Sequence, residues 1–153
     1  PSIREKVKAA YLRACERLKG KAIPRIAWGL RTNKEQADLY ALGRTKPGKK
    51  VTWALPGSSY HNYGLAWDIV LLKDTNGDGT FDTASWETNV DFDGDGKADW
   101  MEVVEEFKLI GAEWGGDWPA KKVDRPHFQI GNLSISTLKS LKKIPGSEWY
   151  PMI

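Results

Sequence analysis

One carboxylate inside an apolar run is the feature that most constrains how this chain can fold. Residues 65–72 are otherwise apolar, and Asp68 is the only charged residue among them. A short apolar run that follows a glycine, here Gly64, is typical of a buried β-strand. Burying a carboxylate is costly unless another group compensates its charge. The fold must therefore bring a partner to Asp68.

The candidate partners are the two histidines, which are the only ones in the chain. His61 lies seven residues before Asp68, whereas His127 belongs to a distant segment. If residues 123–130 pair beside the strand at 65–72, the three side chains can converge on one face of a sheet. Two imidazoles and one carboxylate, with a fourth position left for water, form the ligand set of a catalytic zinc ion.

Asp124 lies three residues before His127 and is not needed as a ligand. It is a candidate acid/base that takes a proton from a zinc-activated water and passes it to the leaving amine. The lone Cys15 excludes an intramolecular disulfide and cysteine-rich zinc sites. Spacing alone leaves a second interpretation open, in which the histidines pack or hydrogen-bond and Asp124 forms a turn.

Hydrophobic periodicity predicts a small α+β domain over residues 1–153, with a central antiparallel sheet flanked by helices. Thr32 and Glu35 form a capping-box pair at the start of one helix, and Gly20 and Gly43 end two of them. The predicted helices are 3–19, 32–42, 100–110 and 136–143, and the predicted strands are a buried one at 25–30, then 65–72 and 128–130.

The net charge of +3 hides a strong asymmetry, because residues 74–102 carry a net charge of −8 and the remainder about +11. A basic body suits an anionic polymer such as nucleic acid or cell wall, although ordinary surface lysines explain it equally well. No helix-turn-helix pattern or basic stripe is present, so we expect no nucleic-acid partner. No apolar run approaches the roughly 18 residues of a membrane span. We expect a monomer.

The acidic segment contains a close match to a twelve-residue calcium loop at residues 91–102. Acidic residues occupy positions 1, 3, 5, 9 and 12 of the loop, glycine occupies position 6, and a helical pattern follows. We expect this loop to bind a structural calcium ion, although a pair of solvated Asp-Gly turns in a hairpin is the alternative. The predicted ligands are Asp91, Asp93, Asp95, Asp99 and Glu102, with Lys97 contributing its backbone carbonyl.

Residues 74–82 repeat the first half of this pattern, so they are a candidate second calcium site. The twelfth position is Ser85, which lacks the bidentate carboxylate of a complete loop. The sequence leaves the number of calcium ions open. The candidate ligands are Asp74, Asn76, Asp78, Thr80 and Asp82.

Several motifs between residues 25 and 130 occur in an order that closely resembles the M15 metallopeptidases. The resemblance excludes the acidic segment, and its nearest branch is the L-alanyl-D-glutamate endopeptidases of bacteria and phage endolysins, relatives of the D-alanyl-D-alanine carboxypeptidases. The motifs are Gly29-Leu30-Arg31-Thr32, Gly43-Arg44-Thr45-Lys46-Pro47-Gly48, Ser59-x-His61-x-x-Gly64-x-Ala66-x-Asp68, Trp114-Gly115-Gly116-Asp117-Trp118 and Asp124-x-Pro126-His127-Phe128.

This resemblance implies the hedgehog-like zinc peptidase fold, with His61, Asp68 and His127 as zinc ligands and Asp124 as the catalytic acid/base. It also implies that Arg31 steadies the carbonyl oxygen as that oxygen gains charge, which agrees with the electrostatics of transition-state stabilisation. The reaction would be hydrolysis of a peptide bond in the peptidoglycan stem, without a covalent acyl-enzyme.

The bond between L-Ala and D-Glu is the expected target, and cleavage of the terminal D-Ala or a non-catalytic wall-binding role are the alternatives. Ser59, Tyr63 and Trp118 are the expected substrate contacts, and further aromatic residues (Trp53, Tyr60, Trp67 and Trp114) are candidates to line a groove. A wall substrate implies an extracellular, periplasmic, wall-associated or phage-lysin setting, and no signal peptide is visible in the sequence.

Overall fold

An antiparallel sheet forms the centre of the computed structural model, which describes residues 1–151. The last two residues of the predicted domain lie outside the described residues. Strand β2 is the centre of the sheet, because it pairs with β1 along one side and with β5 and β3 along the other. The strands are β1 (Ile23–Trp28), β2 (Ala66–Lys73), β3 (Thr83–Ser85), β4 (Glu113–Trp114) and β5 (His127–Gln129).

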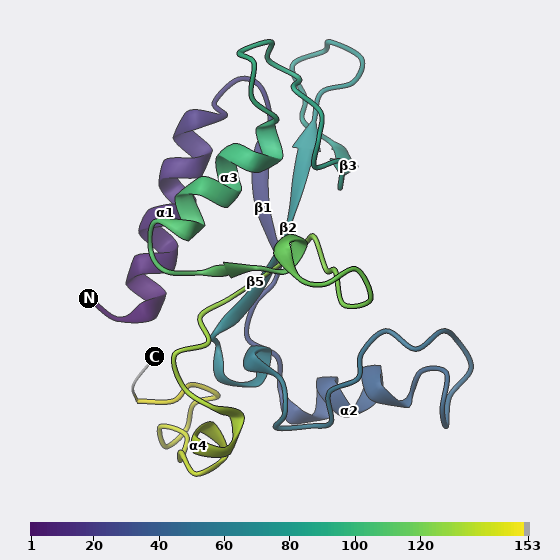
Figure 1. Cartoon of the computed structure of the whole chain (residues 1–153), viewed down its shortest axis with the longest axis vertical. Helices are drawn as coiled ribbons and strands as arrows, with labels where there is room; N and C mark the ends of the chain where they lie inside the picture. The colour runs from purple at the N-terminus through teal and green to yellow at the C-terminus, as the bar shows by residue number, and fades with distance from the viewer. Residues whose placement is uncertain (152–153) are drawn as a thin grey trace.

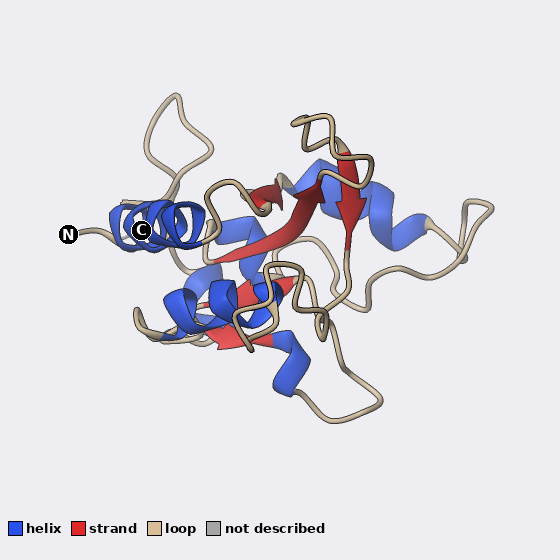
Figure 2. Cartoon of the chain, turned by 90° about the horizontal axis from the view of Figure 1, so that it is seen from above, coloured by secondary structure: helices blue, strands red, loops and turns tan. Residues whose placement is uncertain are grey.

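Two helices, α1 (Ile3–Arg17) and α3 (Asp99–Lys108), lie side by side against the sheet (Figure 1). The shorter helices α2 (Asn33–Ala41) and α4 (Ile135–Lys139) lie toward the opposite end of the molecule, and long loops connect the elements (Figures 1 and 2). Two 3-10 turns complete the fold: η1 (Tyr60–Tyr63) and η2 (Gly115–Asp117). These elements confirm the predicted α+β class. Across residues 1–151, none of the helices has the length and apolar character needed to cross a membrane.

Alternation along β2 places Asp68 on the face opposite the main core. Trp67, Ile69 and Leu71 are buried in the cluster that also holds the aromatic rings of Phe107 and Phe128. Because successive side chains of a strand point to opposite faces, Asp68 points away from these rings. The apolar run therefore forms the predicted strand, and its single carboxylate faces the other side of the sheet.

Strand β5 pairs antiparallel with the first half of β2, as the sequence interpretation required. Asp68 lies directly opposite His127 in this register, and Trp67 lies opposite Phe128. Since Phe128 is buried in the core, the alternation of β5 places His127 on the same face as Asp68. The distant histidine thus reaches the carboxylate through strand pairing.

The capping box predicted for the second helix is confirmed. The Thr32 hydroxyl accepts a hydrogen bond from the backbone N–H of Glu35, and the Glu35 carboxylate accepts one from the backbone N–H of Thr32. Ser2 and Glu5 form the same reciprocal pair at the start of α1, which the sequence interpretation missed. These caps satisfy N–H groups that have no partner within the helix.

The strand predicted at residues 25–30 is present with shifted bounds, but the prediction that it is buried is wrong. Strand β1 begins at Ile23 and ends at Trp28, and five of its six residues are exposed. It lies at the edge of the sheet and pairs with β2 alone, so only one side of its backbone is covered. The last predicted helix, 136–143, is also shorter than expected, since α4 ends at Lys139.

Gly64 ends the η1 turn with a φ of +71°, and a Cβ at this position would lie 2.5 Å from Trp149 Cζ3. We expect Gly64→Ala to lower the free energy of unfolding by about 1–2 kcal/mol through the positive φ and by a further 1–3 kcal/mol through this clash. Gly20→Ala is the matched control, because Gly20 has a φ of +78° and no atom within 4 Å of its added Cβ. Urea unfolding of the two variants measures the difference, and equal losses would contradict the role of the clash.

Candidate active site

His61 is held in the η1 turn with one ring nitrogen facing the sheet. The backbone N–H of Arg31 donates to the carbonyl of His61, and the ring Nδ1 lies 2.9 Å from the carbonyl oxygen of Gly29. A carbonyl can only accept, so Nδ1 carries the proton in this contact. The unprotonated Nε2 of the neutral ring then faces Asp68, 3.4 Å from its Oδ2.

His127 approaches the other oxygen of the same carboxylate. Its Nδ1 lies 3.2 Å from Asp68 Oδ1, and its Nε2 lies 2.9 Å from Gln129 Oε1. The Gln129 amide nitrogen donates to Glu113, which directs the amide oxygen toward His127. The Nε2–H of His127 therefore donates to Gln129, so Nδ1 donates to Asp68 when the ring is protonated and presents a lone pair toward Asp68 when the ring is neutral.

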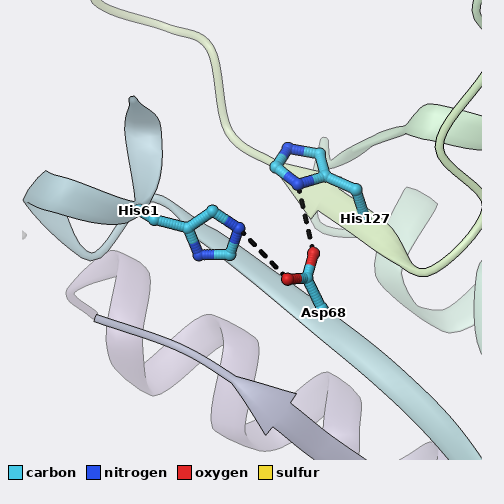
Figure 3. Close-up of side chains that lie close together, drawn as sticks. All are labelled: His61, Asp68 and His127. Carbon is cyan, nitrogen blue, oxygen red and sulfur yellow. Dashed lines mark hydrogen bonds and ion pairs between the residues drawn. The ribbon is translucent and has the colours of Figure 1, made fainter. Parts of the chain in front are cut away.

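Three electron-pair donors thus point at one another, as Figure 3 shows for His61, Asp68 and His127. One donor atom from each residue lies within 4.8 Å of the other two, and the imidazole centroids are 5.1 Å apart. Lone pairs facing a carboxylate repel it unless a proton or a metal cation lies between them. This donor set fits a tetrahedral ion with nitrogen and oxygen ligands.

The pKa values of this cluster depart from their ordinary values in opposite directions. Burial alone would raise the pKa of Asp68, but the hydrogen bonds and charges of His127 and His61 outweigh it and lower that pKa. Burial alone would lower the pKa of His127, but its hydrogen bonds to Asp68 and Gln129 raise it. The carboxylate is therefore held in its charged form and attracts a cation.

A cavity of about 250 Å³ opens directly onto these three residues. Arg31 and Asp124 line the same cavity, so all five residues predicted for zinc binding and catalysis surround one space. Ser59, a predicted substrate contact, also lines it, and its hydroxyl accepts a hydrogen bond from the backbone N–H of His61.

Arg31 is buried beside Asp68, with 3.9 Å between its Nη2 and Asp68 Oδ2. Its Nη1 donates to the Gln36 side chain, and its buried Nε has no hydrogen-bond partner among the described residues. Burial lowers the pKa of Arg31, although the charge of Asp68 opposes this. A guanidinium with donors left over at a cavity wall can bind an oxygen of a ligand.

Asp124 lies at the exposed rim of the cavity, and its backbone is fixed on both sides. Its N–H donates to the carbonyl of Gly115, and its carbonyl accepts from the N–H of His127. Any Cβ at Gly115 would collide with the Asp124 carbonyl oxygen, which accounts for the glycine there. Partial desolvation raises the pKa of Asp124, while the charge of His127 opposes the rise. A carboxyl group with a raised pKa suits proton transfer.

Of the remaining predicted substrate contacts, Trp118 lies near the site and Tyr63 does not. The Trp118 ring centroid is 5.2 Å from that of His127. The prediction for Tyr63 is wrong, because its side chain is 2% exposed and its hydroxyl donates to the Gly57 carbonyl. Trp67 and Trp114 also belong to the core and do not line this cavity.

Two groups that orient the histidines were missed from the sequence, the Gly29 carbonyl and the Gln129 side chain. Gln129 lies two residues after His127 on β5 and therefore points to the same face. Strand alternation could have identified it. A backbone carbonyl carries no such signal, so the role of Gly29 follows only from the fold.

The acidic segment follows the C-terminal end of β2 (Figure 1), whereas Asp68 lies near the start of that strand. Two overlapping groups of carboxylates there could each surround an ion, and Asp93 belongs to both. The groups are Asp91, Asp93 and Asp99, and Asp93, Asp95 and Glu102. Within residues 1–151, the candidate ligands at 74–82 form no comparable group.

Comparisons with known proteins point to one family. A family model of the M15 peptidases, described as D-alanyl-D-alanine carboxypeptidase, matches residues 54–130, about half of the chain. The peptidoglycan L-alanyl-D-glutamate endopeptidase CwlK of Bacillus subtilis (strain 168) is 50% identical over 105 residues, which are 69% of this chain and 59% of that protein. The chain therefore spans less than two thirds of the length of this relative.

The opposite pKa shifts predict how pH affects the stability of the metal-free protein. The raised pKa of His127 contributes stability that is present below its ordinary value of 6.5 and is lost as the pH rises through the folded value. The lowered pKa of Asp68 contributes stability that is present above its ordinary value of 3.8 and is lost as the pH falls through the folded value. The pair therefore contributes most between about pH 4 and 6.5.

We expect metal-free wild type to lose unfolding free energy through this pair as the pH rises above about 6.5. Asp68→Asn should lose less as the pH rises, because the carboxylate that raises the pKa of His127 most is then absent. Asp38→Asn is the control, since Asp38 is an exposed carboxylate paired with Lys34 outside the cavity. Urea unfolding at a series of pH values tests this, and an unchanged slope in Asp68→Asn would refute it.

Proposed function

Because this chain belongs to the M15 peptidase family, we propose that it is a zinc-dependent hydrolase of the peptidoglycan stem peptide. The observation that carries the proposal is the convergence of three lone-pair donors, from His61, Asp68 and His127, on one point at the wall of a cavity. Arg31 and Asp124 add a hydrogen-bond donor and a titratable carboxyl group to the same space. This set of groups suits hydrolysis of an amide.

The three donors fit zinc in number and type, and each imidazole has an acceptor behind it. Gly29 accepts from His61 and Gln129 accepts from His127, which fixes the ring nitrogen that faces the ion. A zinc ion in such a site polarises a carbonyl oxygen and lowers the pKa of a bound water to about 7.

Asp124 carries out both proton transfers of the proposed reaction. Its carboxylate takes a proton from the attacking water as the oxygen bonds to the carbonyl carbon, and returns that proton to the amine nitrogen as the C–N bond breaks. The raised pKa of Asp124 brings the group closer to the pH at which both transfers are efficient.

Arg31 stabilises the carbonyl oxygen of the substrate as negative charge develops on it. The guanidinium is buried, so its field is weakly screened, and its Gln36 contact restricts its position. Its Nη2 has only a long contact of 3.9 Å with Asp68 Oδ2, which leaves donor capacity for a ligand. Ser59 and Trp118 border the same region and are proposed as substrate contacts.

We propose the bond between L-Ala and D-Glu as the target, in line with the name of the Bacillus subtilis relative. The description of the matching family model keeps a D-alanyl-D-alanine carboxypeptidase as the second candidate. Either activity places the protein at the bacterial cell wall. The proposal also includes one structural calcium ion in the 91–102 loop.

Digestion of purified muropeptides followed by mass spectrometry tests the activity. Zinc-loaded wild type is expected to release a fragment that begins with D-Glu. Asp124→Ala is expected to lose about 10²–10⁴-fold in rate, the usual contribution of a general acid–base residue. Release of terminal D-Ala alone would support the carboxypeptidase, and absence of cleavage by zinc-loaded wild type would favour a non-catalytic wall-binding module.

The acceptor behind His127 gives a test of zinc binding that does not depend on activity. Gln129→Leu removes the oxygen that accepts from Nε2, and we expect the affinity for zinc to fall about 10–100-fold. The double change Gln129→Glu with Glu113→Gln keeps an acceptor facing His127 and restores a donor at position 113, so it should retain most of the affinity. Competition with a chromogenic chelator measures both, and equal affinities in wild type and Gln129→Leu would overturn the assignment of Nδ1 as the ligand atom.

A further inference from the structure

We infer that the 91–102 loop binds a single calcium ion, that the neighbouring 74–82 loop does not, and that the ammonium group of Lys21 competes with the ion. This inference deepens the calcium part of the proposed function. It concerns the end of β2 that lies away from the cavity, so it can be tested without peptidase activity.

The two loops have the same internal hydrogen bonds, so loop geometry does not distinguish them. In one loop the Asp74 carboxylate accepts from the N–H groups of Gly77 and Gly79. In the other, the Asp91 carboxylate accepts from Gly94 and Gly96 at the equivalent positions. The loops differ in the segment that comes directly after each of them in the chain.

Only the second loop continues into a helix that brings buried carboxylates to it. Asp99 and Glu102 occupy the first turn of α3 and are 0% and 5% exposed. Their equivalents after the first loop are Asp82, which is exposed, and Ser85 in β3. The first loop therefore lacks the carboxylate at its twelfth position, and its ninth residue is not held in a buried helical turn.

Each of these buried carboxylates has one oxygen without a hydrogen-bond partner among the described residues, Oδ1 of Asp99 and Oε2 of Glu102. A buried carboxylate oxygen without a hydrogen-bond partner costs more free energy than a buried neutral polar group without one. A cation in contact with these two oxygens would supply the missing partner.

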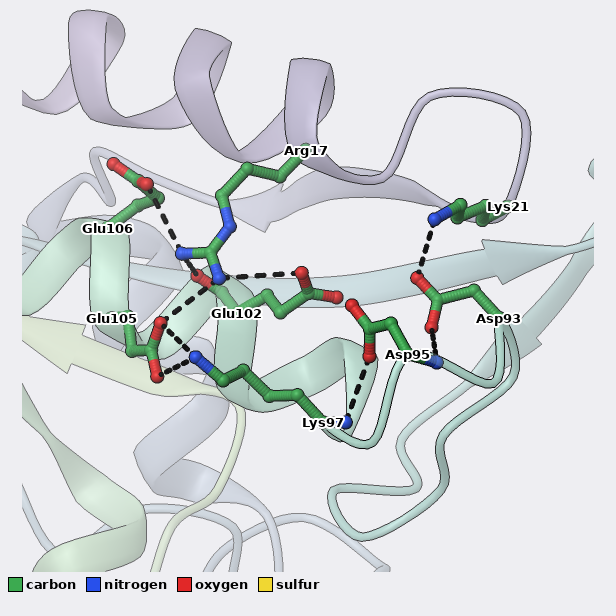
Figure 4. A network of polar contacts seen from close by, with 8 residues as sticks. All are labelled: Arg17, Lys21, Asp93, Asp95, Lys97, Glu102, Glu105 and Glu106. Carbon is green, nitrogen blue, oxygen red and sulfur yellow. Dashed lines mark hydrogen bonds and ion pairs between the residues drawn. The ribbon is translucent and has the colours of Figure 1, made fainter.

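The unpartnered oxygens belong to residues whose carboxylates are grouped around Asp93. Donor oxygens of Asp91, Asp93 and Asp99 lie within 4.8 Å of one another, and so do those of Asp93, Asp95 and Glu102. Figure 4 shows the Glu102 carboxylate extending toward Asp95. Five carboxylates and a loop carbonyl match the six to eight oxygens that calcium prefers, whereas magnesium requires a stricter octahedron.

The side chain of Lys97 is directed out of the loop, where its Nζ lies 2.9 Å from Glu105 Oε1 on α3 (Figure 4). This arrangement keeps its ammonium group away from the carboxylates, and it is consistent with the backbone carbonyl of Lys97 serving as the sixth ligand.

Positively charged side chains contact three of the five carboxylates. At Asp99 and Glu102 the contact is made with the oxygen that is not the unpartnered one. Lys73 Nζ lies 3.2 Å from Asp99 Oδ2, and Arg17 lies 3.4 Å from Glu102 Oε1, so each leaves the unpartnered oxygen free for an ion. Lys21 instead lies 3.0 Å from Asp93 Oδ2, on the carboxylate that both groups share. Since a divalent ion needs the charge of Asp93, Lys21 opposes its binding.

Calcium titration of EDTA-treated, zinc-restored protein tests the inference by calorimetry, and terbium luminescence sensitised by Trp100 gives a second readout. We expect one ion per chain, and a higher melting temperature in calcium. Asp95→Asn should weaken calcium binding at least tenfold, whereas Asp78→Asn, the equivalent change in the first loop, should leave it unchanged. Lys21→Met should tighten binding several-fold, while Lys19→Met serves as a charge-matched control without this effect.

Absence of calcium binding at millimolar concentration, or equal losses in Asp95→Asn and Asp78→Asn, would overturn the site. An unchanged affinity in Lys21→Met would overturn the competition. Asp95, Asp78 and Lys21 are exposed positions, so these variants should fold. Because no substrate is present, a failure here leaves the peptidase proposal standing, and an inactive protein that binds calcium would contradict only the peptidase proposal.

Discussion

The pairing of Asp68 with His127 across β2 and β5 is the interaction on which the rest of the site depends. The two residues lie directly opposite each other, and beside them the rings of Trp67 and Phe128 stack in the core with centroids 6.0 Å apart. A slip of one residue in β5 would move His127 onto the core face of the sheet and Phe128 out of the core. The burial of the rings therefore sets the register that brings the carboxylate and the imidazole together.

This dependence explains why much of the site could be predicted from the sequence. A lone carboxylate in an apolar strand requires a partner, and a chain with two histidines offers few choices. Strand alternation then relates Asp68 to His127 once the two strands are paired. The capping pair of Thr32 and Glu35 was predictable for a similar reason, because both of its hydrogen bonds are local.

The features that could not be predicted depend on contacts between distant segments. The apolar residues of β1 look like those of a buried strand, and only the position of β1 at the sheet edge leaves Ile26 and Trp28 exposed. Tyr63 looked available because it lies close to His61 in the chain, yet it packs against Tyr150 near the C-terminus. Local periodicity describes which faces are apolar, but it does not say which segment covers each face.

The two ends of β2 hold carboxylates whose charge is compensated in different ways. Asp68 faces imidazoles, which exchange protons near neutral pH and can give their lone pairs to a metal ion. Asp99 faces the ammonium group of Lys73, which has no lone pair to give while it is charged. The imidazoles can therefore share a metal ion with Asp68, whereas the ammonium group of Lys73 can only balance the charge of the Asp99 oxygen that it contacts. The different properties of the two ends of β2 thus follow from the type of nitrogen group that each carboxylate meets.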